Sequence, residues 1–427
     1  MPKSELKKEL SLFETTVYGI GVILGAGIYA IIGKAAGVSG DSFWLSFVIA
    51  GLIAAFTGLS YAELSSMYPK SASSYVYTRK AFNRRSLSFV IGWVVIVGLI
   101  VAGATVALAF SGYFASLFST PIVPVAIASI ALFTAVNYIG IKESAKFNII
   151  STFIEAGGLI IIVILGLSFW GNPDINYFDM QAGIPGLLAG VTLVFFAFIG
   201  FEDLANISEE TKNATKVIPR ALLISLAFSA ILYILVAISA VSVLGSAALA
   251  TSSAPLTDVA VAVIGPQILW IYSIIALFAT GNTMLIFLIV ASRMLYGISN
   301  EGGLPKFFGQ LHTIRRTPYF SILFVGLIAS VLTLIGDIGI VASLTDIGVF
   351  IAFFFVNLSL VWLRFTKPKE KRPFRMPVNI GKFPLIAALG AVTCFYMLFH
   401  FEPVIVLAEV VVIIVGAAVY TIYSRHK

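Results

Sequence analysis

The stretch Gly19-Ile-Gly-Val-Ile-Leu-Gly-Ala-Gly-Ile28 lies in the middle of an apolar run over residues 13–37. A run of this length can cross a bilayer, because a hydrocarbon core of roughly 30 Å needs about 20 residues of helix. Its glycines crowd one level of the run, where each weakens the helix. Backbone opens at such depth only when it is buried in protein or lines a water-filled cavity. The stretch therefore predicts either an interrupted helix beside a cavity or close helix packing through small residues, and this segment alone leaves both open.

Hydrophobic residues dominate the rest of the chain as well. Of its 427 residues, 59% are hydrophobic and only 11% are charged, whereas a soluble domain carries about 25% charged residues. A water-soluble protein of this length could not bury so much apolar surface in one core. The composition therefore indicates that lipid is the solvent.

Twelve apolar runs of spanning length follow one another along the sequence. We expect an all-α integral membrane protein with twelve transmembrane helices in a single domain, residues 1–427. The runs cover about 13–37, 42–66, 87–117, 121–139, 147–170, 184–207, 220–245, 262–296, 318–336, 340–365, 381–400 and 403–423. The eighth run is too long for one upright span, so we expect it to tilt or to continue beyond the membrane.

Basic residues are distributed unevenly between the connecting segments. With the N-terminus inside, the inner segments and tails hold 26 of the 27 Lys and Arg residues, and only Lys34 falls outside. The outer loops carry Asp174, Asp179, Asp258 and Glu402 instead. Short loops with this bias set the orientation of a membrane protein. We expect a multi-pass protein of the cell membrane with both termini in the cytoplasm, and we interpret the net charge of +7 as a topology signal and not as a nucleic-acid-binding surface.

A second glycine interrupts the sixth run. It reads Phe195-Phe-Ala-Phe-Ile-Gly-Phe-Glu-Asp203, and apolar helix gives way to polar residues after Gly200. Two interrupted segments at corresponding positions of two halves are typical of a transporter binding site. An opened Gly25-Ala26-Gly27 would turn the N-terminal end of the outer half-helix toward a cavity, where free N–H groups and the helix dipole hold a carboxylate.

Short motifs in five regions of the chain resemble those of a known family. They are Gly25-Ala-Gly-Ile28; Tyr61-Ala-Glu-Leu64 with Pro69 and Tyr75-Val-Tyr77; Phe196-Ala-Phe-Ile-Gly-Phe-Glu202 with Glu209-Glu-Thr-Lys-Asn213 and Ile218-Pro-Arg220; Arg293-Met-Leu-Tyr296 with Glu301-Gly-Gly-Leu-Pro305 and Arg316-Thr-Pro318; and Arg372-Pro-Phe-Arg375. In this order they resemble the amino acid–polyamine–organocation (APC) superfamily of permeases, near its cationic amino acid transporter branch. The matches run from about residue 10 to about residue 380.

The resemblance implies a five-plus-five inverted-repeat transporter fold with broken helices 1 and 6. Helices 1–5, about 13–170, would form the first repeat, helices 6–10, about 184–365, the second, and helices 11–12, about 381–423, would be peripheral. It also implies that the substrate carboxylate binds the first break and the amino group binds carbonyls of the sixth helix. The substrate-binding residues nominated in this way are Ile23, Gly25, Ala26, Gly27, Phe196, Ala197, Ile199, Gly200 and Glu202.

Two positions depart from the family pattern. Ala26 stands where relatives often carry a hydroxyl residue, and the loop after the second span reads Ser71-Ala-Ser-Ser74 without the usual glycine. The first departure changes side-chain hydrogen bonding to the substrate, whereas backbone donors at the break would remain.

Glu155 lies inside the fifth run. A charge near the bilayer centre costs at least ~2.5–3.5 kcal/mol on insertion scales, so this side chain should face the protein interior. We expect it to carry the coupling proton, although proton-coupled members of the family often have a lysine at this site. Binding of a cation and a structural hydrogen bond to a neighbouring helix remain as alternatives.

The remaining acidic residues in the spans have less specific interpretations. Glu202 could attract a cationic substrate or sense pH; a glutamate at this place is tied to acid-sensing in the resembling arginine–agmatine exchangers. Alternatively, Glu202 and Asp203 could solvate the inner half of the sixth helix. For Glu63 and Glu14 we favour solvated end charges over a gate ion pair with the Arg79–Arg85 cluster. Two further acids are expected to be buried and have no assigned role: Asp346 and Glu409.

These features favour secondary active transport of neutral or cationic amino acids by alternating access. Proton symport is the preferred mechanism, and exchange or sodium coupling is the alternative. An integral-membrane enzyme would need a catalytic cluster, a channel would need a pore-lining repeat, and direct use of ATP would need a phosphate-binding GxxxxGK[ST] loop, none of which the sequence contains. We expect no cofactor, no metal and no disulfide-linked subunit, because the single cysteine, Cys394, lies inside a span.

Overall fold

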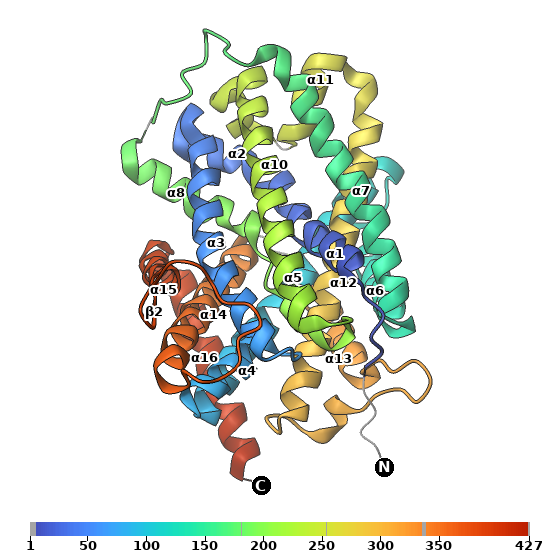
Figure 1. The fold of residues 1–427 in the computed structure, drawn as a ribbon. Helices are drawn as coiled ribbons and strands as arrows, with labels where there is room; N and C mark the ends of the chain where they lie inside the picture. Colours follow the sequence, from blue (N-terminus) through green and yellow to red (C-terminus); the bar gives the residue numbers. More distant parts are fainter. Residues whose placement is uncertain (1–5, 181, 253, 335–338, 426–427) are drawn as a thin grey trace.

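The computed structural model describes residues 6–180, 182–252, 254–334 and 339–425. Nearly all of this chain is helix (Figure 1). The helices are α1 Leu12–Leu24, α2 Ala26–Ser39, α3 Phe43–Met67, α4 Ser73–Phe82, α5 Arg85–Phe118, α6 Ile122–Ile139, α7 Ile141–Gly166, α8 Gly183–Phe195, α9 Asp203–Asn206, α10 Ala214–Thr251, α11 Pro255–Ile264, α12 Leu269–Asn300, α13 Tyr319–Leu332, α14 Gly339–Thr366, α15 Leu385–Met397 and α16 Pro403–Arg425. One short antiparallel hairpin joins β1, Asn379–Ile380, to β2, Phe383–Pro384.

The predicted apolar runs coincide with these helices. Within the described residues, ten helices are long and apolar enough to cross a membrane, and three shorter apolar helices lie at Pro255–Ile264, Tyr319–Leu332 and Leu385–His400. The first residues of the eighth run close α11, after which Gly265, with a φ of +108°, and Pro266 separate α11 from α12. The rest of the run lies in α12, one helix of 32 residues that continues to Asn300, and its tilt in the membrane stays a prediction. The end of the ninth run, at 335–336, lies outside the described residues. An integral membrane protein is the architecture that these helices support.

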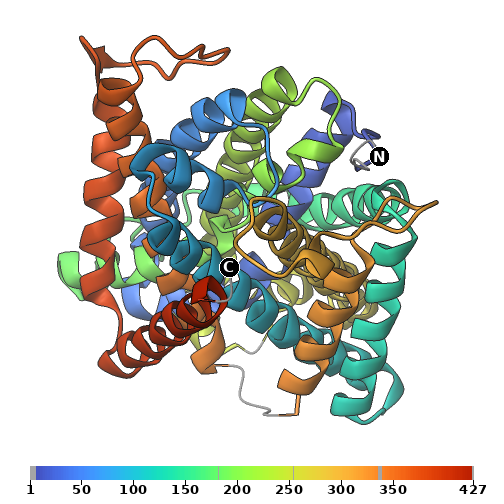
Figure 2. The same cartoon turned by 90° about the horizontal axis from the view of Figure 1, so that it is seen from below.

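The helices pack side by side in one bundle. α10 lies along α3 and α1, and α12 lies along α5 and α7. α15 packs against α14 and α3, and α16 packs against α5 and α14. Figure 2 looks along the bundle and places α15 and α16 at one edge of it. The interior of the bundle is therefore formed mainly by α1, α3, α5, α10 and α12.

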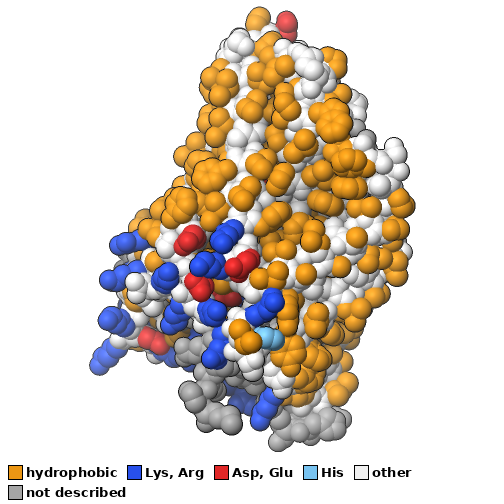
Figure 3. All heavy atoms as spheres, turned by 90° about the vertical axis from the view of Figure 1, so that its right-hand side faces the viewer, with side chains coloured by type: hydrophobic (Ala, Val, Ile, Leu, Met, Phe, Trp, Pro, Cys, Tyr) orange, Lys and Arg blue, Asp and Glu red, His pale blue; other side chains and the backbone are white. Residues whose placement is uncertain are grey.

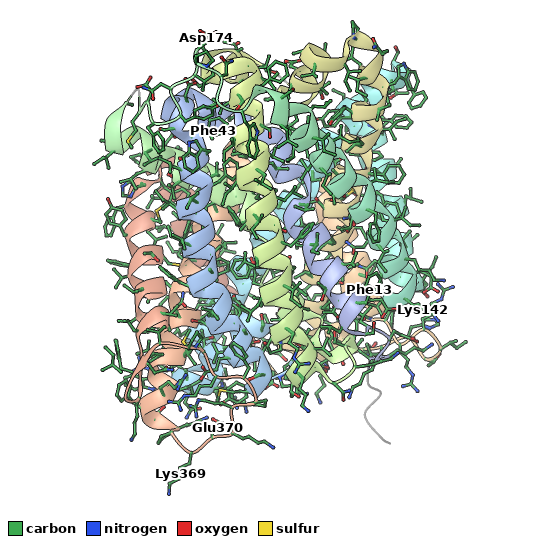
Figure 4. The ribbon with its side chains drawn as sticks, turned by 45° about the horizontal axis from the view of Figure 1, so that its top comes forward. Phe13, Phe43, Lys142, Asp174, Lys369 and Glu370 are labelled. Carbon is green, nitrogen blue, oxygen red and sulfur yellow. The ribbon has the colours of Figure 1, made fainter. Side chains whose placement is uncertain are left out.

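The two ends of the bundle differ in charge. Leu6 and Arg425, where the described chain begins and ends, lie at the same end, which we call the terminal face (Figure 1). Figure 3 shows Lys and Arg side chains gathered at this end below a broad hydrophobic surface. Figure 4 places Lys142, Lys369 and Glu370 at the terminal face and Asp174 at the opposite end, the distal face. Basic side chains thus gather at the terminal face, with acidic side chains among them.

Glu63 is a correction to the sequence analysis. We expected a solvated end charge or a partner in the Arg79–Arg85 cluster, yet the Glu63 side chain is fully buried. Nη2 of Arg364 lies 2.7 Å and Nε of Arg372 lies 3.1 Å from its carboxylate oxygens, and the backbone N–H of Met376 donates to it at 2.9 Å. The loop after α14 folds back beneath α3 and supplies partners that are distant in the sequence.

A second buried ion pair ties the terminal face together. Arg293 of α12 is fully buried and donates from Nε and Nη2 to both carboxylate oxygens of Glu210, at 3.1 and 2.9 Å, and from Nη1 to Asn137 at 2.6 Å. Lys212 N donates to the carbonyl of Leu10 at 2.8 Å, so the segment before α1 also joins this layer. The pair therefore connects α12, α6 and the loop before α10.

The glycine missing from the loop after α3 has a structural consequence. Ala72 stands in the left-handed region, with φ 61° and ψ 49°. A residue with a Cβ pays roughly 1–2 kcal/mol in this conformation. The departure from the family pattern therefore leaves a strained alanine at the start of α4.

Candidate functional site

The first helix is interrupted at Gly25. α1 ends at Leu24 and α2 begins at Ala26, and Gly25 between them has φ −39° and ψ −154°, which are not helical angles. A Cβ on Gly25 would lie 2.0 Å from Oγ1 of Thr283 on α12. The same hydroxyl accepts a hydrogen bond from the N–H of Ala26 at 3.1 Å. Glycine is thus required here because the threonine that caps α2 occupies the space of a side chain.

The second interruption lies directly opposite the first. α8 ends at Phe195, a 3-10 turn covers Phe196–Phe198, Ile199 is extended and Gly200 has φ +117°. A Cβ on Gly200 would meet Cγ1 of Val22 at 2.1 Å, and one on Gly27 would meet Cα of Ala197 at 2.9 Å. The backbones of the two segments therefore touch, and small residues make this approach possible.

Tyr233 of α10 links the two interruptions. Its buried hydroxyl hydrogen-bonds to the carbonyl oxygens of Ile23 and Ala197, one from each segment, the second at 3.1 Å. Sequence reasoning missed this residue. The one available signal was a tyrosine inside an apolar span, since a buried tyrosine hydroxyl usually finds a partner.

A small cavity of about 20 Å³ lies where the two segments meet. Its lining includes seven of the nine residues nominated for substrate binding: Ile23, Gly25, Ala26, Gly27, Phe196, Ala197 and Ile199. Five further lining residues were not predicted: Val22, Val106, Thr283, Phe287 and Thr345. They come from α1, α5, α12 and α14, and their sequence context marks them only as members of apolar spans. The structure thus brings most of the nominated residues together, while their role in binding stays a prediction.

Gly200 and Glu202 do not line this cavity. The Glu202 carboxylate turns back on its own chain, where Oε2 accepts the N–H of Gly200 at 2.9 Å. Asp203 is buried beside it, and its Oδ2 has no hydrogen-bond partner among the described residues. Neither acid forms an ion pair with Lys or Arg among the described residues, and Glu202 stabilises the bend at Gly200.

The cavity combines backbone polarity with apolar walls. The first N–H groups of α2 have no acceptor within their helix, as at any helix start, and only that of Ala26 is taken by Thr283. The last carbonyls of α1 likewise face out of their helix. Among the described residues that line the cavity, none carries a charged side chain. The arrangement can therefore hold a carboxylate and an ammonium group on backbone atoms and an uncharged group against the walls.

Glu155 lies behind the first interruption, on α7. Its side chain is fully buried, and neither carboxylate oxygen has a hydrogen bond of good geometry among the described residues. Tyr29, Tyr233 and Asn282 lie close enough to interact with it electrostatically. Asn282 also donates to the carbonyl of Gly21 at 3.4 Å. Tyr233 and Asn282 thus lie near Glu155 and also bond carbonyls of α1, at Ile23 and Gly21.

The other acids of the spans lie away from the cavity lining. Asp346 and Glu409 are buried, as expected, and Oδ1 of the first and Oε1 of the second lack a partner among the described residues. Glu14 accepts the N–H of Ser11 at 2.7 Å and so caps α1. Glu409 lies near Gly348 of α14, because a Cβ there would be 3.6 Å from its Oε1.

Comparison with known proteins gives one family over nearly the whole chain. The model of the amino acid permease family matches residues 10–421. A branched-chain amino acid permease of Bacillus subtilis is 29% identical over 99% of this chain and 94% of its own length. A methylthioribose transporter of the same organism is 30% identical over 98% of this chain and 94% of its own, and a mitochondrial cationic amino acid transporter of Arabidopsis thaliana is 28% identical over 86% and 64%.

Proposed function

The chain belongs to the amino acid permease family, and we propose that it carries a small neutral amino acid across the cell membrane by proton-coupled alternating access. The observation that carries this proposal is the cavity between the two interrupted segments, with its backbone donors and acceptors and its uncharged walls. A permease of this family is not an enzyme, so the residues at the cavity bind, orient and release their ligand.

The helix interruptions supply the recognition of an amino acid. We assign the substrate carboxylate to the free N–H groups of Gly27 and Ile28 at the start of α2, where the helix dipole favours an anion. We assign the ammonium group to the outward carbonyls of Ile23 and Ala197. These N–H donors and carbonyl acceptors all belong to the backbone, so they recognise the carboxylate and ammonium groups that all amino acids share. The lack of a side-chain hydroxyl at Ala26 therefore removes no donor that this recognition needs.

The walls select the substrate side chain. Val22, Val106 and Phe287 line the cavity, and Thr283 and Thr345 are its polar side chains. A cationic side chain would enter without a partner, which costs several kcal/mol in an apolar site. We therefore place a small neutral side chain here, and the name of the Bacillus subtilis branched-chain permease agrees with that choice. A second candidate substrate is an uncharged molecule that is not an amino acid, because one of the relatives is named a methylthioribose transporter.

The cavity must widen for transport. At about 20 Å³ it holds little more than one water molecule. An amino acid enters only if the two interrupted segments separate, which supports alternating access. We propose twelve spans, two five-helix repeats with broken helices 1 and 6, and a terminal face in the cytoplasm, where short basic loops belong.

Glu155 is our choice for the coupling proton. It is buried, lacks a basic partner among the described ion pairs, and lies near Tyr233, whose hydroxyl bonds both interrupted segments. A proton on Glu155 makes the site behind α1 neutral, and its release changes the field at the carbonyls that we assign to the ammonium group. The runner-up mechanisms are exchange and sodium coupling.

Uptake into proteoliposomes tests the substrate assignment. We expect saturable uptake of labelled alanine, valine or leucine, and weak competition by arginine and methylthioribose. Thr283→Ala should raise KM about tenfold, because it removes the hydrogen bond that caps α2 at the Ala26 N–H. Near a charged ligand this hydrogen bond contributes about 1 kcal/mol or more. Thr280→Ala is the matched control, since Thr280 donates to Ala276 within α12 and does not line the cavity. Saturable uptake of arginine in preference to every neutral amino acid would refute the neutral-substrate proposal.

A further inference from the structure

An apolar groove lies between α6 and α13. Its volume is about 490 Å³, which is within the range of ligand pockets. It is lined by Ile130, Ala131, Thr134, Ala135, Tyr138, Tyr319, Leu323, Gly326, Leu327 and Ser330. α6 has the length and composition of a membrane span, α13 is an apolar helix beside it, and Leu323 and Leu327 are exposed on its surface. Lipid acyl chains are therefore the medium that this groove faces.

The floor of the groove is a close helix contact. A Cβ on Gly326 of α13 would lie 2.4 Å from Oγ1 of Thr134 on α6. The groove is thus a depression between two helices that already touch, and within the described residues its lining comes from α6 and α13 alone. Its lining is apolar apart from the hydroxyls of Thr134, Tyr138, Tyr319 and Ser330, which suits an acyl chain.

The end of the groove nearest the terminal face carries a fixed cation. The guanidinium carbon of Arg315 lies 4.9 Å from the ring centroid of Tyr138. His312 Nδ1 accepts the N–H of Arg315 at 3.2 Å, and Thr317 Oγ1 donates to the carbonyl of Tyr138 at 3.1 Å. A guanidinium that stacks on a ring keeps the N–H groups at its edge free for an oxyanion. The turn therefore holds Arg315 at the groove mouth in a form suited to a phosphate.

Positive charge is in excess around this mouth. An adjoining cavity of about 300 Å³ is lined by four basic side chains, Lys7, Lys142, Arg315 and Arg316, and by the acids Glu9, Glu143 and Glu210. Glu210 is neutralised by Arg293. Lys142, Arg315 and Arg316 make no ion pair within 4.0 Å in the part of the chain that the structure describes. Figure 4 shows Lys142 in the lower half of the molecule, on the opposite side from Lys369.

We propose that the groove between α6 and α13 binds a phospholipid with an anionic headgroup, its acyl chain between the helices and its phosphate at Arg315 and Arg316. Acyl chains surround the groove, and tyrosines such as Tyr138 and Tyr319 are typical of the level where hydrocarbon meets headgroups. Basic pockets between transmembrane helices on the cytoplasmic side bind anionic headgroups. The site is separate from the substrate cavity and rests only on the proposed orientation of the terminal face.

Lipid retention tests this site. The protein is reconstituted with equal amounts of phosphatidylglycerol and phosphatidylcholine, extracted in mild detergent, and examined by native mass spectrometry for lipid that stays bound. Three single variants are compared with the parent chain. Arg315→Gln removes the charge at the mouth, Ala135→Phe fills the exposed groove and keeps the charge, and Lys369→Gln removes an exposed basic residue from another loop of the same face.

We expect the parent chain and Lys369→Gln to retain phosphatidylglycerol in preference to phosphatidylcholine. Arg315→Gln should lower this retention roughly tenfold, because a charge-assisted hydrogen bond is lost, and Ala135→Phe should lower it by a similar factor through the groove alone. Equal retention of both lipids by the parent chain would overturn headgroup recognition. Unchanged retention in Ala135→Phe, or an equal loss in Lys369→Gln, would overturn the location and point to diffuse attraction by the whole basic face.

Discussion

Gly25→Ala tests the geometry of the first helix interruption. The added methyl would lie 2.0 Å from Oγ1 of Thr283 and 3.3 Å from its Cβ. Overpacking of this kind costs about 1–3 kcal/mol. The backbone at Gly25 has φ −39°, so alanine meets no left-handed strain there and the clash is the main cost. We expect Gly25→Ala to lower the free energy of unfolding by this amount and substrate affinity by about tenfold or more.

The clash should disappear when the hydroxyl is removed as well. Thr283→Ala alone loses the cap on the Ala26 N–H, about 1 kcal/mol. In Gly25→Ala/Thr283→Ala the 2.0 Å clash is gone, and the nearest remaining contact of the new methyl is a tight 3.3 Å approach to the Cβ of residue 283. The double variant should therefore be more stable than the sum of the single effects by about 1–2 kcal/mol, a coupling expected for residues in contact. Thermal unfolding and substrate binding of the four proteins in detergent measure this. Strictly additive effects, or a Gly25→Ala protein as stable as the parent, would refute the proposed geometry.

Three further predictions concern the terminal face. Arg293→Ala leaves the buried Glu210 without its partner and should lower the free energy of unfolding by about 3–5 kcal/mol, whereas the double variant Arg293→Met/Glu210→Leu should lower it less. Thermal unfolding measures both, with Lys369→Ala as the control at an exposed residue. Equal losses of stability in the two variants would contradict the explanation by an unpaired buried charge. Burial raises the pKa of the Glu209 carboxyl above its usual 4.5, against the lowering effects of Lys70 and the Ser71 N–H. Because the pKa of Glu209 is higher in the folded than in the unfolded state, its stabilising effect is full below about pH 4.5 and is lost as pH rises through the folded-state pKa. The melting temperature of the parent should therefore fall relative to that of Glu209→Gln over this pH range. A difference in melting temperature that does not change with pH would speak against this explanation. Ala72→Gly should stabilise the protein by about 0.5–1 kcal/mol, because the backbone strain that it removes is larger than the conformational entropy that the added glycine loses on folding. A loss of stability in chemical unfolding would show that the strain is absent.

The sequence predicted the apolar helices and the glycines near which α1 and α8 end, because these depend on local composition. Apolar runs of about 20 residues locate spans, and Gly25 and Gly200 stand where a side chain would collide with another segment. Thr283 and Tyr233 could not be found in this way. Each forms hydrogen bonds with residues far away in the sequence, and the local sequence around a threonine or tyrosine in an apolar run does not indicate which residue it bonds.

Glu63 shows where the local argument fails. Its position at the end of a span indicated a solvated charge, but Arg372 and the Met376 N–H return to it from a loop more than three hundred residues later in the chain. The start of the eighth run shows a different limit, because Gly265 and Pro266 separate its first residues, which close α11, from α12, and hydrophobicity alone joins the two. Glu202, whose role in substrate binding stays a prediction, accepts the Gly200 N–H, a short-range contact that depends on the angle of the bend.

The most direct test of the account is gradient-driven uptake by the Glu155→Gln variant. Proteoliposomes with an acidic exterior and a neutral interior are supplied with the labelled neutral amino acid, and the Glu409→Gln variant serves as control because Glu409 is also buried but lies on α16. We expect the parent chain and Glu409→Gln to accumulate substrate above equilibrium, whereas Glu155→Gln should exchange substrate across the membrane but not accumulate it. Accumulation by Glu155→Gln equal to that of the parent, or accumulation by the parent that requires a sodium gradient, would contradict the account.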